Sequence, residues 1–299
     1  MSLVIVGSVA FDTVETSFGR REKIVGGSGT YCSLAASYFT RPKVVGVIGR
    51  DFPKKTLALL RSRRVDLLGL RIRPGKTFHW EGRYGEDPNV RTTVRTELNV
   101  FRDFRPEIPA AYAKADIVYL ANIDPDVHGF ILRQFGTPKA VAMDTIRYWI
   151  ETKRDALVRE LGRVDIFFAN DEEARLLSGD SNLIAAGKTL LGFGPALVVL
   201  KKGEHGAIIF GREFIFGVLA HPHARVVDPT GAGDAFAGGF LGYLDKAGSF
   251  ARREVRRAAV YGSVLASYAI EDFGIGRFLT LDRAAIECRF REFRKLVSF

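Results

Sequence analysis

The chain has 299 residues, of which 47% are hydrophobic and 26% are charged, a balance typical of a protein with a buried core. No apolar run approaches the roughly 18 residues that cross a bilayer, so we expect no membrane partner. The net charge of +10 and the pI near 9.7 would suit nucleic acid, but the basic residues are scattered. We therefore expect solvated helix faces and no nucleic-acid partner.

The first residues form an apolar run without a basic flank, which predicts a first strand and not a signal peptide. The two cysteines, Cys32 and Cys288, lie far apart and match no metal-binding spacing. Buried free thiols in a reducing compartment are the expected state, so we expect a cytoplasmic protein.

Strand-like and helix-like stretches alternate along the chain, which predicts a layered α/β fold with a mostly parallel sheet. The predicted strands are residues 3–6, 43–48, 117–121, 140–142, 166–169, 196–200 and 207–210. The predicted helices are residues 30–39, 54–64, 153–161, 172–177 and 183–191. No internal repeat or low-complexity linker interrupts this order, so we expect a single domain over residues 1–299.

Two stretches, residues 12–25 and 70–101, break the α/β alternation. They are rich in Thr, Val, Arg, Phe and Tyr, and polar and apolar residues alternate in them, which is the period of exposed antiparallel strands. We expect these two inserts to pair into a small separate sheet. The alternative is a surface hairpin with no role in closing a site.

Polar residues and glycines follow the first predicted strands. Asp12 comes shortly after the first strand, and Asn122 follows another strand, where parallel sheets bind their ligands. A carboxylate at Asp12 could accept two hydrogen bonds from a diol, although a turn-forming role is the simpler alternative. Gly26 and Gly27 lead into the first predicted helix, a weak signal on its own.

Two further strand ends carry recognisable local patterns. Asn170 and Glu173 have the spacing of a capping box, in which each side chain binds the main chain of the other. Lys201 is followed by a turn with Gly203 and Gly206, which predicts a hairpin to the next strand.

The most informative run is residues 228–234, Asp-Pro-Thr-Gly-Ala-Gly-Asp. Residues 224–227 before it predict a strand end, and apolar residues at helical spacing follow it. Gly231, Ala232 and Gly233 therefore lie where a loop enters a helix, and the free N–H groups of the first turn favour an anion. Asp234 lies beside them, where it could accept a proton from a hydroxyl. A glycine-rich helix start with a capping aspartate is the alternative.

This run resembles the signature Asp-Thr-x-Gly-Ala-Gly-Asp of the ribokinase/PfkB family of carbohydrate and nucleoside kinases, with Pro229 as the one departure. The resemblance implies a three-layer α/β/α ribokinase-like fold with a small β-sheet lid. It also implies an ATP-dependent transfer of phosphate to a hydroxyl of a small polyhydroxylated substrate. Asp234 would be the catalytic base, and Gly231, Ala232 and Gly233 would form the anion hole.

The resemblance extends to the other motifs in family order and assigns the remaining site residues. Family analogy gives the substrate side as Asp12, Gly26, Gly27, Tyr31 and Asn122, and the ATP side as Lys201, Gly203, Gly206, Asn170, Glu173 and Asp228. Asn170 and Glu173 match the Asn-x-x-Glu motif that organises Mg²⁺ and phosphate, mostly through water. Tyr31 stands where the family has an asparagine, so the substrate can differ from ribose or fructose derivatives.

The acceptor therefore stays open at this point. A sugar is the first expectation, and a nucleoside or an inositol-like polyol are the alternatives, since Tyr31 and aromatic residues of the second insert could stack on a base. A nucleotide-binding regulator with a basic nucleic-acid-binding surface is the non-enzymatic alternative. The resemblance also allows a monovalent-cation requirement and a homodimer formed through the lid.

Overall fold

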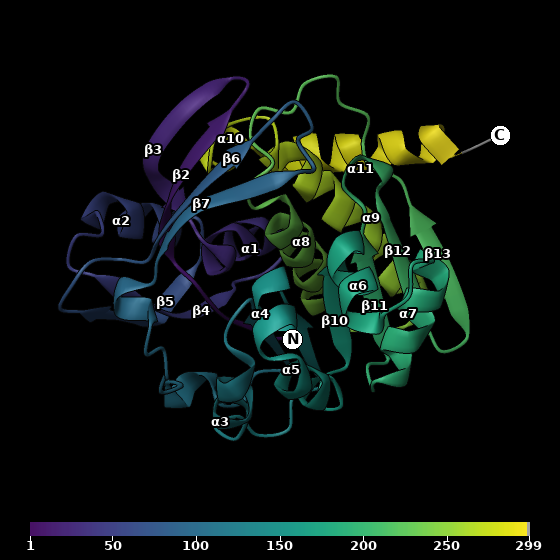
Figure 1. Cartoon of the computed structure of the whole chain (residues 1–299), viewed down its shortest axis with the longest axis horizontal. Coiled ribbons are helices and arrows are strands. Elements are labelled where there is room, and N and C mark those ends of the chain that lie inside the picture. The colour runs from purple at the N-terminus through teal and green to yellow at the C-terminus, as the bar shows by residue number, and fades with distance from the viewer. Residues whose placement is uncertain (298–299) are drawn as a thin grey trace.

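The computed structural model describes residues 1–297 and contains two β-sheets (Figure 1). The large sheet has nine strands in the order β13-β12-β11-β10-β9-β8-β1-β4-β5. Its strands are β1 (Leu3–Gly7), β4 (Lys43–Gly49), β5 (Asp66–Arg73), β8 (Ile117–Ala121), β9 (Ala140–Asp144), β10 (Ile166–Asn170), β11 (Leu197–Lys201), β12 (Ala207–Gly211) and β13 (Phe214–Val218). Every pair from β5 to β11 is parallel, whereas β12 and β13 form an antiparallel edge.

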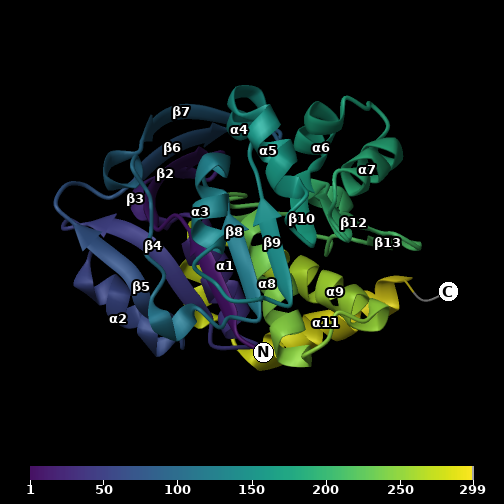
Figure 2. The same ribbon diagram turned by 90° about the horizontal axis from the view of Figure 1, so that it is seen from below.

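Helices cover both faces of the large sheet, which gives three layers. One face packs on α1 (Ser28–Ser37), α2 (Lys54–Ser62), α8 (Ala232–Ala247), α9 (Arg252–Ala269), α10 (Gly276–Thr280) and α11 (Arg283–Val297). The other packs on α3 (His128–Leu132), α4 (Arg147–Thr152), α5 (Arg154–Leu161), α6 (Asp171–Ser178) and α7 (Leu183–Gly192). Figure 2 shows α4 to α7 on one side of the sheet and α8, α9 and α11 on the other.

The two helix layers explain why β1 is apolar throughout. Leu3 and Ile5 belong to one buried core, and Val4 and Val6 belong to the other, because successive side chains of a strand point to opposite faces. Both faces are buried, so the strand reads as a continuous hydrophobic run. Among residues 1–297, no helix combines the length and the apolar character that a bilayer crossing would need.

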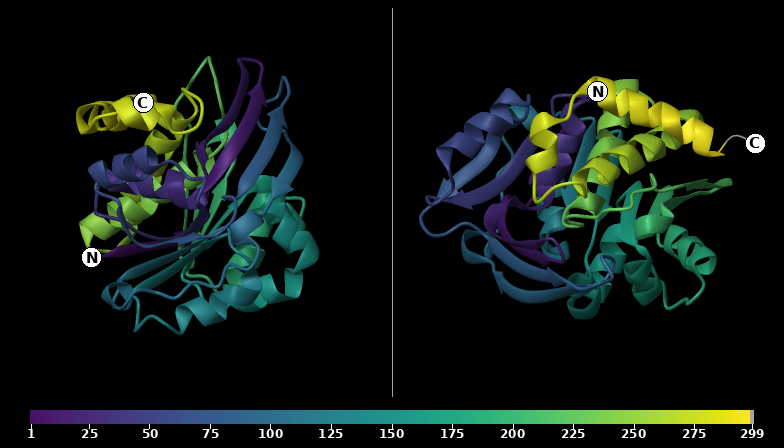
Figure 3. Two further views of the ribbon diagram at one scale, coloured as in Figure 1. Left: turned by 90° about the vertical axis from the view of Figure 1, so that its left-hand side faces the viewer. Right: turned by 90° about the horizontal axis from the view of Figure 1, so that it is seen from above.

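The small sheet has the order β3-β2-β6-β7 and is built from the two predicted inserts. Its strands are β2 (Ala10–Thr16), β3 (Gly19–Gly26), β6 (His79–Tyr84) and β7 (Arg91–Glu97). The inserts meet at β2 and β6, which pair in parallel, so the expectation of a separate sheet is confirmed. The left view of Figure 3 shows its purple and blue strands projecting together beside the large sheet.

Three sequence expectations differ from the structure. Residues 70–73 lie in β5 and not in the second insert. Since β5 is an edge strand in which Leu68 and Ile72 are more than half exposed, its alternating polar and apolar residues resemble those of a surface hairpin. Residues 224–227 form no strand, because this segment is instead held by the N–H of Val227 on the carbonyl of Ile270. Both cysteines are free, but Cys288 is exposed on α11.

Candidate active site

The predicted site residues gather at one edge of the large sheet. Of the predicted residues, Asp12 follows β1, Asn122 follows β8 and Lys201 ends β11; Asp144, which was not predicted, ends β9. Since these strands are parallel, their carboxyl ends lie along the same edge, where open α/β sheets bind ligands. The first turn of α8 also lies at this edge, because its Gly233 lies against Lys201.

The start of α8 forms an anion-binding turn. Its N-cap, Gly231, has φ 76°, and no side chain caps the helix. The first N–H groups of the helix have no carbonyl acceptor within it. The Ala232 N–H donates to the Pro229 carbonyl at 3.3 Å, and the N–H groups that follow it can meet an anion. A Cβ on Gly233 would come within 3.1 Å of the Lys201 Nζ atom, so the lysine lies against this turn.

Lys201 forms a buried ion pair with Asp144, whose Oδ2 atom lies 2.6 Å from the lysine Nζ. Asp144 also accepts hydrogen bonds from the Tyr119 hydroxyl at 3.3 Å and from the Thr145 N–H at 2.8 Å. Burial acts to lower the pKa of Lys201, but Asp144 and Glu173 raise it overall. The lysine therefore stays charged and supplies a fixed positive charge beside the α8 turn.

Asp234 has the electrostatic character of a general base. Burial and the charge of Asp144 raise its pKa to about 7, while Lys201 and Arg91 oppose that shift. A carboxylate with this pKa is partly ionised at neutral pH and accepts a proton more readily than an ordinary aspartate. The expected base is thus placed beside both the anion turn and Lys201.

Asn170 and Glu173 form the predicted capping box at the start of α6. The Asn170 N–H donates to Glu173 Oε2 at 2.8 Å, and the Glu173 N–H donates to Asn170 Oδ1 at 2.7 Å. Burial and Asp144 raise the pKa of Glu173 to about 7. These two hydrogen bonds cap the start of α6. The second oxygen of the buried Glu173 carboxylate takes no part in the cap.

The donor set suits a hydrated divalent cation. The charge of Asp144 raises the pKa of Glu173 and the pKa of Asp234, and Lys201 forms its ion pair with Asp144. No cluster of three His, Cys, Asp or Glu side chains within residues 1–297 has the geometry of direct ligation. Carboxylates that outnumber their cationic partners but do not surround a metal directly fit Mg²⁺, because this ion keeps several of its water ligands.

Asp12 lies buried in β2 against the two glycines that start α1. A Cβ on Gly26 would come within 1.8 Å of Asp12 Oδ2, so only glycine fits there. Gly27 has φ 92°, and a Cβ would clash with the Ser8 carbonyl at 2.6 Å. Burial and the nearby Asp228 raise the pKa of Asp12 to about 8. The Gly27 N–H and the charge of Arg91 oppose this shift in the pKa of Asp12 but do not cancel it.

Asp228 braces the signature run. Its Oδ1 accepts the Thr230 N–H at 2.9 Å, and its Oδ2 accepts the Gly274 N–H at 2.9 Å. Both carboxylate oxygens therefore join the run to the segment after α9. This engagement accounts for a buried aspartate without a ligand, although the resemblance assigned it to the ATP side.

Several buried polar atoms near the strand ends have no hydrogen-bond partner within residues 1–297. They are the hydroxyls of Thr30, Tyr31 and Thr145 and the Oδ1 atom of Asn122. Asn122 also has φ 51°, a strained value for a residue with a side chain. Unsatisfied buried polar groups are costly, so such groups at a strand edge point to a bound ligand.

Tyr31 can offer a ligand its hydroxyl but not the face of its ring. The residue is 1% exposed, and its ring packs against Gly231, so the expectation that it could stack on a substrate ring is not supported. Burial and the carboxylates of Asp12 and Asp228 raise its pKa, which keeps the hydroxyl protonated as a donor.

Gly203 and Gly206 form the turn of the predicted β11–β12 hairpin, which is confirmed by antiparallel pairing. Both have positive φ values, 52° and 79°. Asn89, in the turn between β6 and β7, lies against Gly203, where a Cβ would come within 2.1 Å of its Oδ1. The small sheet therefore reaches across to the loop that the resemblance assigned to phosphate.

Sequence reasoning missed Asp144 and Arg91. Asp144 ends a short buried strand and has no motif around it, and its partner Lys201 is 57 residues away. Arg91 lies in a strand where arginine and threonine alternate, so it looked like an ordinary surface residue. The one local signal for Asp144 was its position at the carboxyl end of a parallel strand.

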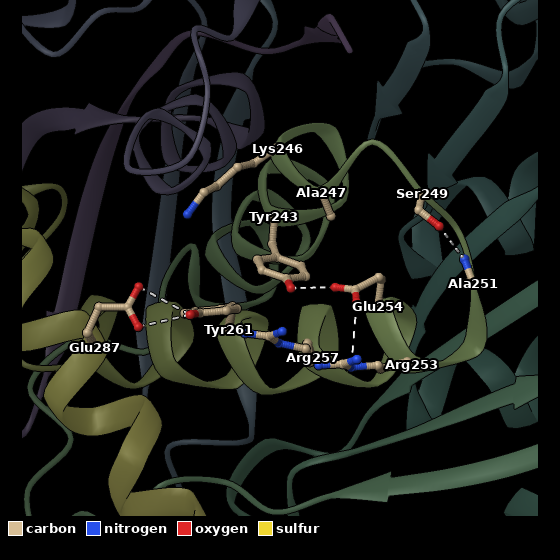
Figure 4. Close-up of a pocket in the computed structure, with 10 residues that line it drawn as sticks. All are labelled: Tyr243, Lys246, Ala247, Ser249, Ala251, Arg253, Glu254, Arg257, Tyr261 and Glu287. Atoms are coloured by element: carbon tan, nitrogen blue, oxygen red, sulfur yellow. Dashed lines mark hydrogen bonds and ion pairs between the residues drawn. The ribbon is translucent and has the colours of Figure 1, made fainter.

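A cavity of about 530 Å³ lies at the other end of α8 and contains none of the predicted site residues (Figure 4). Basic side chains of Lys246, Arg253 and Arg257 line it together with two tyrosines. The hydroxyls of Tyr243 and Tyr261 both donate to glutamates of α9 and α11, Glu254 and Glu287. Because it lies at the C-terminal end of α8 and none of the predicted site residues line it, this cavity is separate from the candidate active site.

Comparison with known proteins gives consistent findings. Residues 2–280 match the pfkB family carbohydrate kinase. The chain is 35% identical over 247 residues to the cytidine kinase of Thermococcus kodakarensis, covering 81% of this chain and 87% of that protein. It is 27% identical over 301 residues to the nucleoside kinase of Methanothermobacter thermautotrophicus, covering 91% and 90%.

Solved structures show the same fold at lower identity. The fructokinase of Vibrio cholerae, solved with fructose, ADP and calcium, superposes with a TM-score of 0.82 at 20% identity over 97% of this chain and 99% of that chain. The nucleoside kinase of Methanocaldococcus jannaschii, described as an archaeal member of the ribokinase family, gives a TM-score of 0.76 at 16% identity over 98% and 99%.

Proposed function

The chain belongs to the pfkB family of carbohydrate kinases, and within this family we propose that it is a nucleoside kinase. It is an ATP-dependent kinase whose acceptor is a hydroxyl of a sugar or a nucleoside. The nucleoside is favoured because a relative with 35% identity over most of both chains is a cytidine kinase. The observation that carries the chemistry is the placement of Asp234, with its pKa of about 7, beside the free amides of α8 and the charged Lys201.

Phosphoryl transfer would use these groups in a single displacement. The acceptor hydroxyl oxygen forms a bond to the γ-phosphorus of ATP, the bond from that phosphorus to the β–γ bridging oxygen breaks, and ADP leaves. Asp234 accepts the hydroxyl proton. The Gly233 N–H at the start of α8 and the charge of Lys201 stabilise the negative charge on the transferring group, and the Ala232 N–H would join them by leaving the Pro229 carbonyl.

The acceptor would lie between Asp12 and the unsatisfied polar atoms at the strand edge. Asp12 can accept two hydrogen bonds from neighbouring hydroxyls, such as those of a ribose, and this would favour its ionised form. The Tyr31 hydroxyl and the Asn122 amide oxygen supply a donor and an acceptor that have no hydrogen-bond partner among residues 1–297. Gly26 and Gly27 let Asp12 and the Ser8 carbonyl pack against the start of α1, which fixes the position of the Asp12 carboxylate.

The ATP phosphates would lie over Lys201 and the Gly203–Gly206 turn. Glu173, with Asn170 beside it, would hold hydrated Mg²⁺, because its carboxylate is buried next to Asp144 and has a pKa raised to about 7. When bound, Mg²⁺ would neutralise phosphate charge. A monovalent-cation requirement, a homodimer through the small sheet and a cytoplasmic location stay predictions.

A substrate panel tests the proposal. Purified protein with Mg-ATP is assayed for ADP release with cytidine, other nucleosides, ribose, fructose and inositol. We expect the highest kcat/KM with a nucleoside. A sugar is the second candidate, because the matching family is named for carbohydrate kinases. Turnover of a sugar alone would replace the nucleoside assignment, and turnover of no panel member would contradict the kinase function.

Tyr31→Phe separates the acceptor site from the phosphate site. The substitution removes only a buried hydroxyl that has no hydrogen-bond partner in the described part of the chain. Loss of the hydroxyl should raise the KM for the acceptor several-fold while the KM for ATP is unchanged, since one hydrogen bond is worth about 1 kcal/mol. An unchanged KM for the acceptor would remove Tyr31 from the substrate contacts.

A further inference from the structure

The small sheet holds the signature run and the β11–β12 turn at two separate points. The Thr230 hydroxyl donates to the Tyr84 hydroxyl at 3.1 Å, and Asn89 lies against Gly203. These contacts join β6 and the β6–β7 turn to the two loops that flank Lys201. Arg91 is the first residue of β7 and pairs directly with Tyr84, so it lies between the two contacts.

Arg91 shares the face of Tyr84, and a β-bulge separates it from Arg95. Tyr84 pairs with Arg91, and Gly82 pairs with Thr93, but Glu81 pairs with Arg95, so Val94 is an extra residue in β7. Successive residues of β6 point to opposite faces. Arg91 therefore lies on the face of Tyr84, which reaches the signature run, and Arg95 lies on the face of Glu81. Without the bulge the two arginines would share one face.

The small-sheet arginines differ in their partners. Arg20 and Arg95 pair with Glu81, at 2.8 Å and 3.3 Å, and Arg83 pairs with Glu15 at 3.2 Å. Among residues 1–297, no carboxylate forms an ion pair with Arg91, whose guanidinium lies 5.5 Å from the Trp80 ring centroid. The Trp80 indole covers Gly82, where any Cβ would clash with it, and so supports Arg91 from the side.

The charge of Arg91 acts on the site carboxylates of three different segments. Burial raises the pKa values of Asp12, Glu173 and Asp234, and Arg91 is among the groups that lower each of them. Its field therefore extends over the acceptor side, the proposed metal side and the base. An unpaired guanidinium in that position fits the oxygens of a phosphoryl group, which it can bind through two parallel hydrogen bonds.

We propose that Arg91 is a catalytic residue whose guanidinium contacts the γ-phosphoryl oxygens of ATP during transfer. This inference rests on the proposed function. The small sheet carries the arginine to the phosphate, and the contacts at Thr230 and Gly203 fix its position. As the bond to the acceptor oxygen forms and the bond to the bridging oxygen breaks, the guanidinium offsets charge on the equatorial oxygens, and the proton still passes to Asp234.

The test compares Arg91→Ala with Arg95→Ala, an arginine of the same strand on the opposite face. Arg91→Ala should lower kcat about 10²–10³-fold with less than about threefold change in the acceptor KM, as for loss of a transition-state contact. Arg91→Lys should recover part of kcat, because it keeps the charge but not the planar fork. Arg95→Ala should stay within about threefold of wild type. Equal kcat values for Arg91→Ala and Arg95→Ala would overturn the inference.

A binding measurement separates catalysis from a structural role and from failure of the proposed function. ADP with Mg²⁺ and aluminium fluoride imitates the transferring phosphoryl group and needs no identified acceptor. We expect Arg91→Ala to weaken its binding at least about tenfold relative to ADP alone, while Arg95→Ala does not. Unchanged binding of this complex in a folded Arg91→Ala variant, as judged by thermal melting, would overturn the inference even if kcat fell.

Discussion

The ring of Tyr31 lies against Gly231, so closely that a Cβ on the glycine would come within 2.6 Å of three ring carbons. This contact joins the first helix to the N-cap of α8. It places the Tyr31 hydroxyl on the acceptor side while its ring supports the anion turn. A change that moves the Tyr31 ring or adds atoms at Gly231 should therefore alter the geometry of phosphate binding, whereas loss of the Tyr31 hydroxyl alone should not.

Gly231→Ala should lower kcat at least about 100-fold, because the new methyl group would displace either the turn or the Tyr31 ring. Gly248, at the other end of α8, is the matched control: it has φ 70°, and a Cβ there would meet nothing within 4 Å. Both variants should lose roughly 1 kcal/mol of unfolding free energy from the left-handed backbone. Equal kcat values for the two variants would show that the contact does not matter.

Asp234→Asn should reduce kcat by about 10²–10⁴-fold, the usual contribution of a general base. In the wild type, kcat/KM should rise with pH and level off above about pH 7, since the pKa of Asp234 is about 7 and only its ionised form accepts a proton. The residual activity of the variant should lose this acid limb. A wild-type profile that is flat between pH 6 and 8 would remove Asp234 from the role of base.

Lys201→Met should reduce kcat/KM for ATP by about 10²-fold and move the acid limb of the pH profile to higher pH. Lys201 lowers the pKa of Asp234, so its removal lets burial and Asp144 raise that pKa further. Lys202→Met is the control, because Lys202 shapes the turn through its main chain, with its N–H donating to the Gly206 carbonyl at 2.7 Å. An acid limb that does not move would mean that Lys201 and Asp234 are not coupled.

Asp12→Asn should stabilise the protein without ligands at alkaline pH and weaken acceptor binding. The pKa of Asp12 is about 8 in the folded state and near 3.8 otherwise, so the folded protein holds more protons and loses stability as the pH rises from about 4 to about 8. The gain from the neutral amide should grow across that window by up to about 1.4 kcal/mol per pH unit.

Thermal melts at pH 5 and pH 8 check this prediction. Asp103→Asn, at an exposed position, should show no such difference between the two pH values. If Asp12→Asn melted at the wild-type temperature at pH 8, the carboxylate would not be destabilised by burial. A gain in stability with unchanged acceptor KM would separate the burial cost from substrate binding.

Local patterns predicted the parts of the site that lie within a few residues of one another. The Asn170–Glu173 capping box and the glycine turn after Lys201 are such features, and both are present. Each feature is formed by residues that are close in the sequence, so their spacing is enough to determine the local geometry. The buried strands were predicted for the same reason, because their apolar runs reflect two covered faces.

The parts that sequence reasoning missed depend on residues far apart in the chain. Lys201 of β11 meets Asp144 of β9 across the intervening strand β10, and the proposed role of Arg91 depends on the contact of the β6–β7 hairpin with Thr230. The start of the second insert was placed too early because β5 is an edge strand whose outward side chains imitate an exposed hairpin. Neither long-range pairing nor edge position is encoded in a short window.

Because Val94 is an extra residue in β7, the number of residues between Arg91 and Arg95 decides whether their side chains lie on the same face of the strand or on opposite faces. A relative that retained both arginines but lost one residue between them would point its arginines to a single side of the strand. Residue identities would be preserved in such a protein, and only chain length would record the difference. Counting positions along this hairpin is therefore a way to sort kinases of this kind by whether they deliver a positive charge to the phosphate.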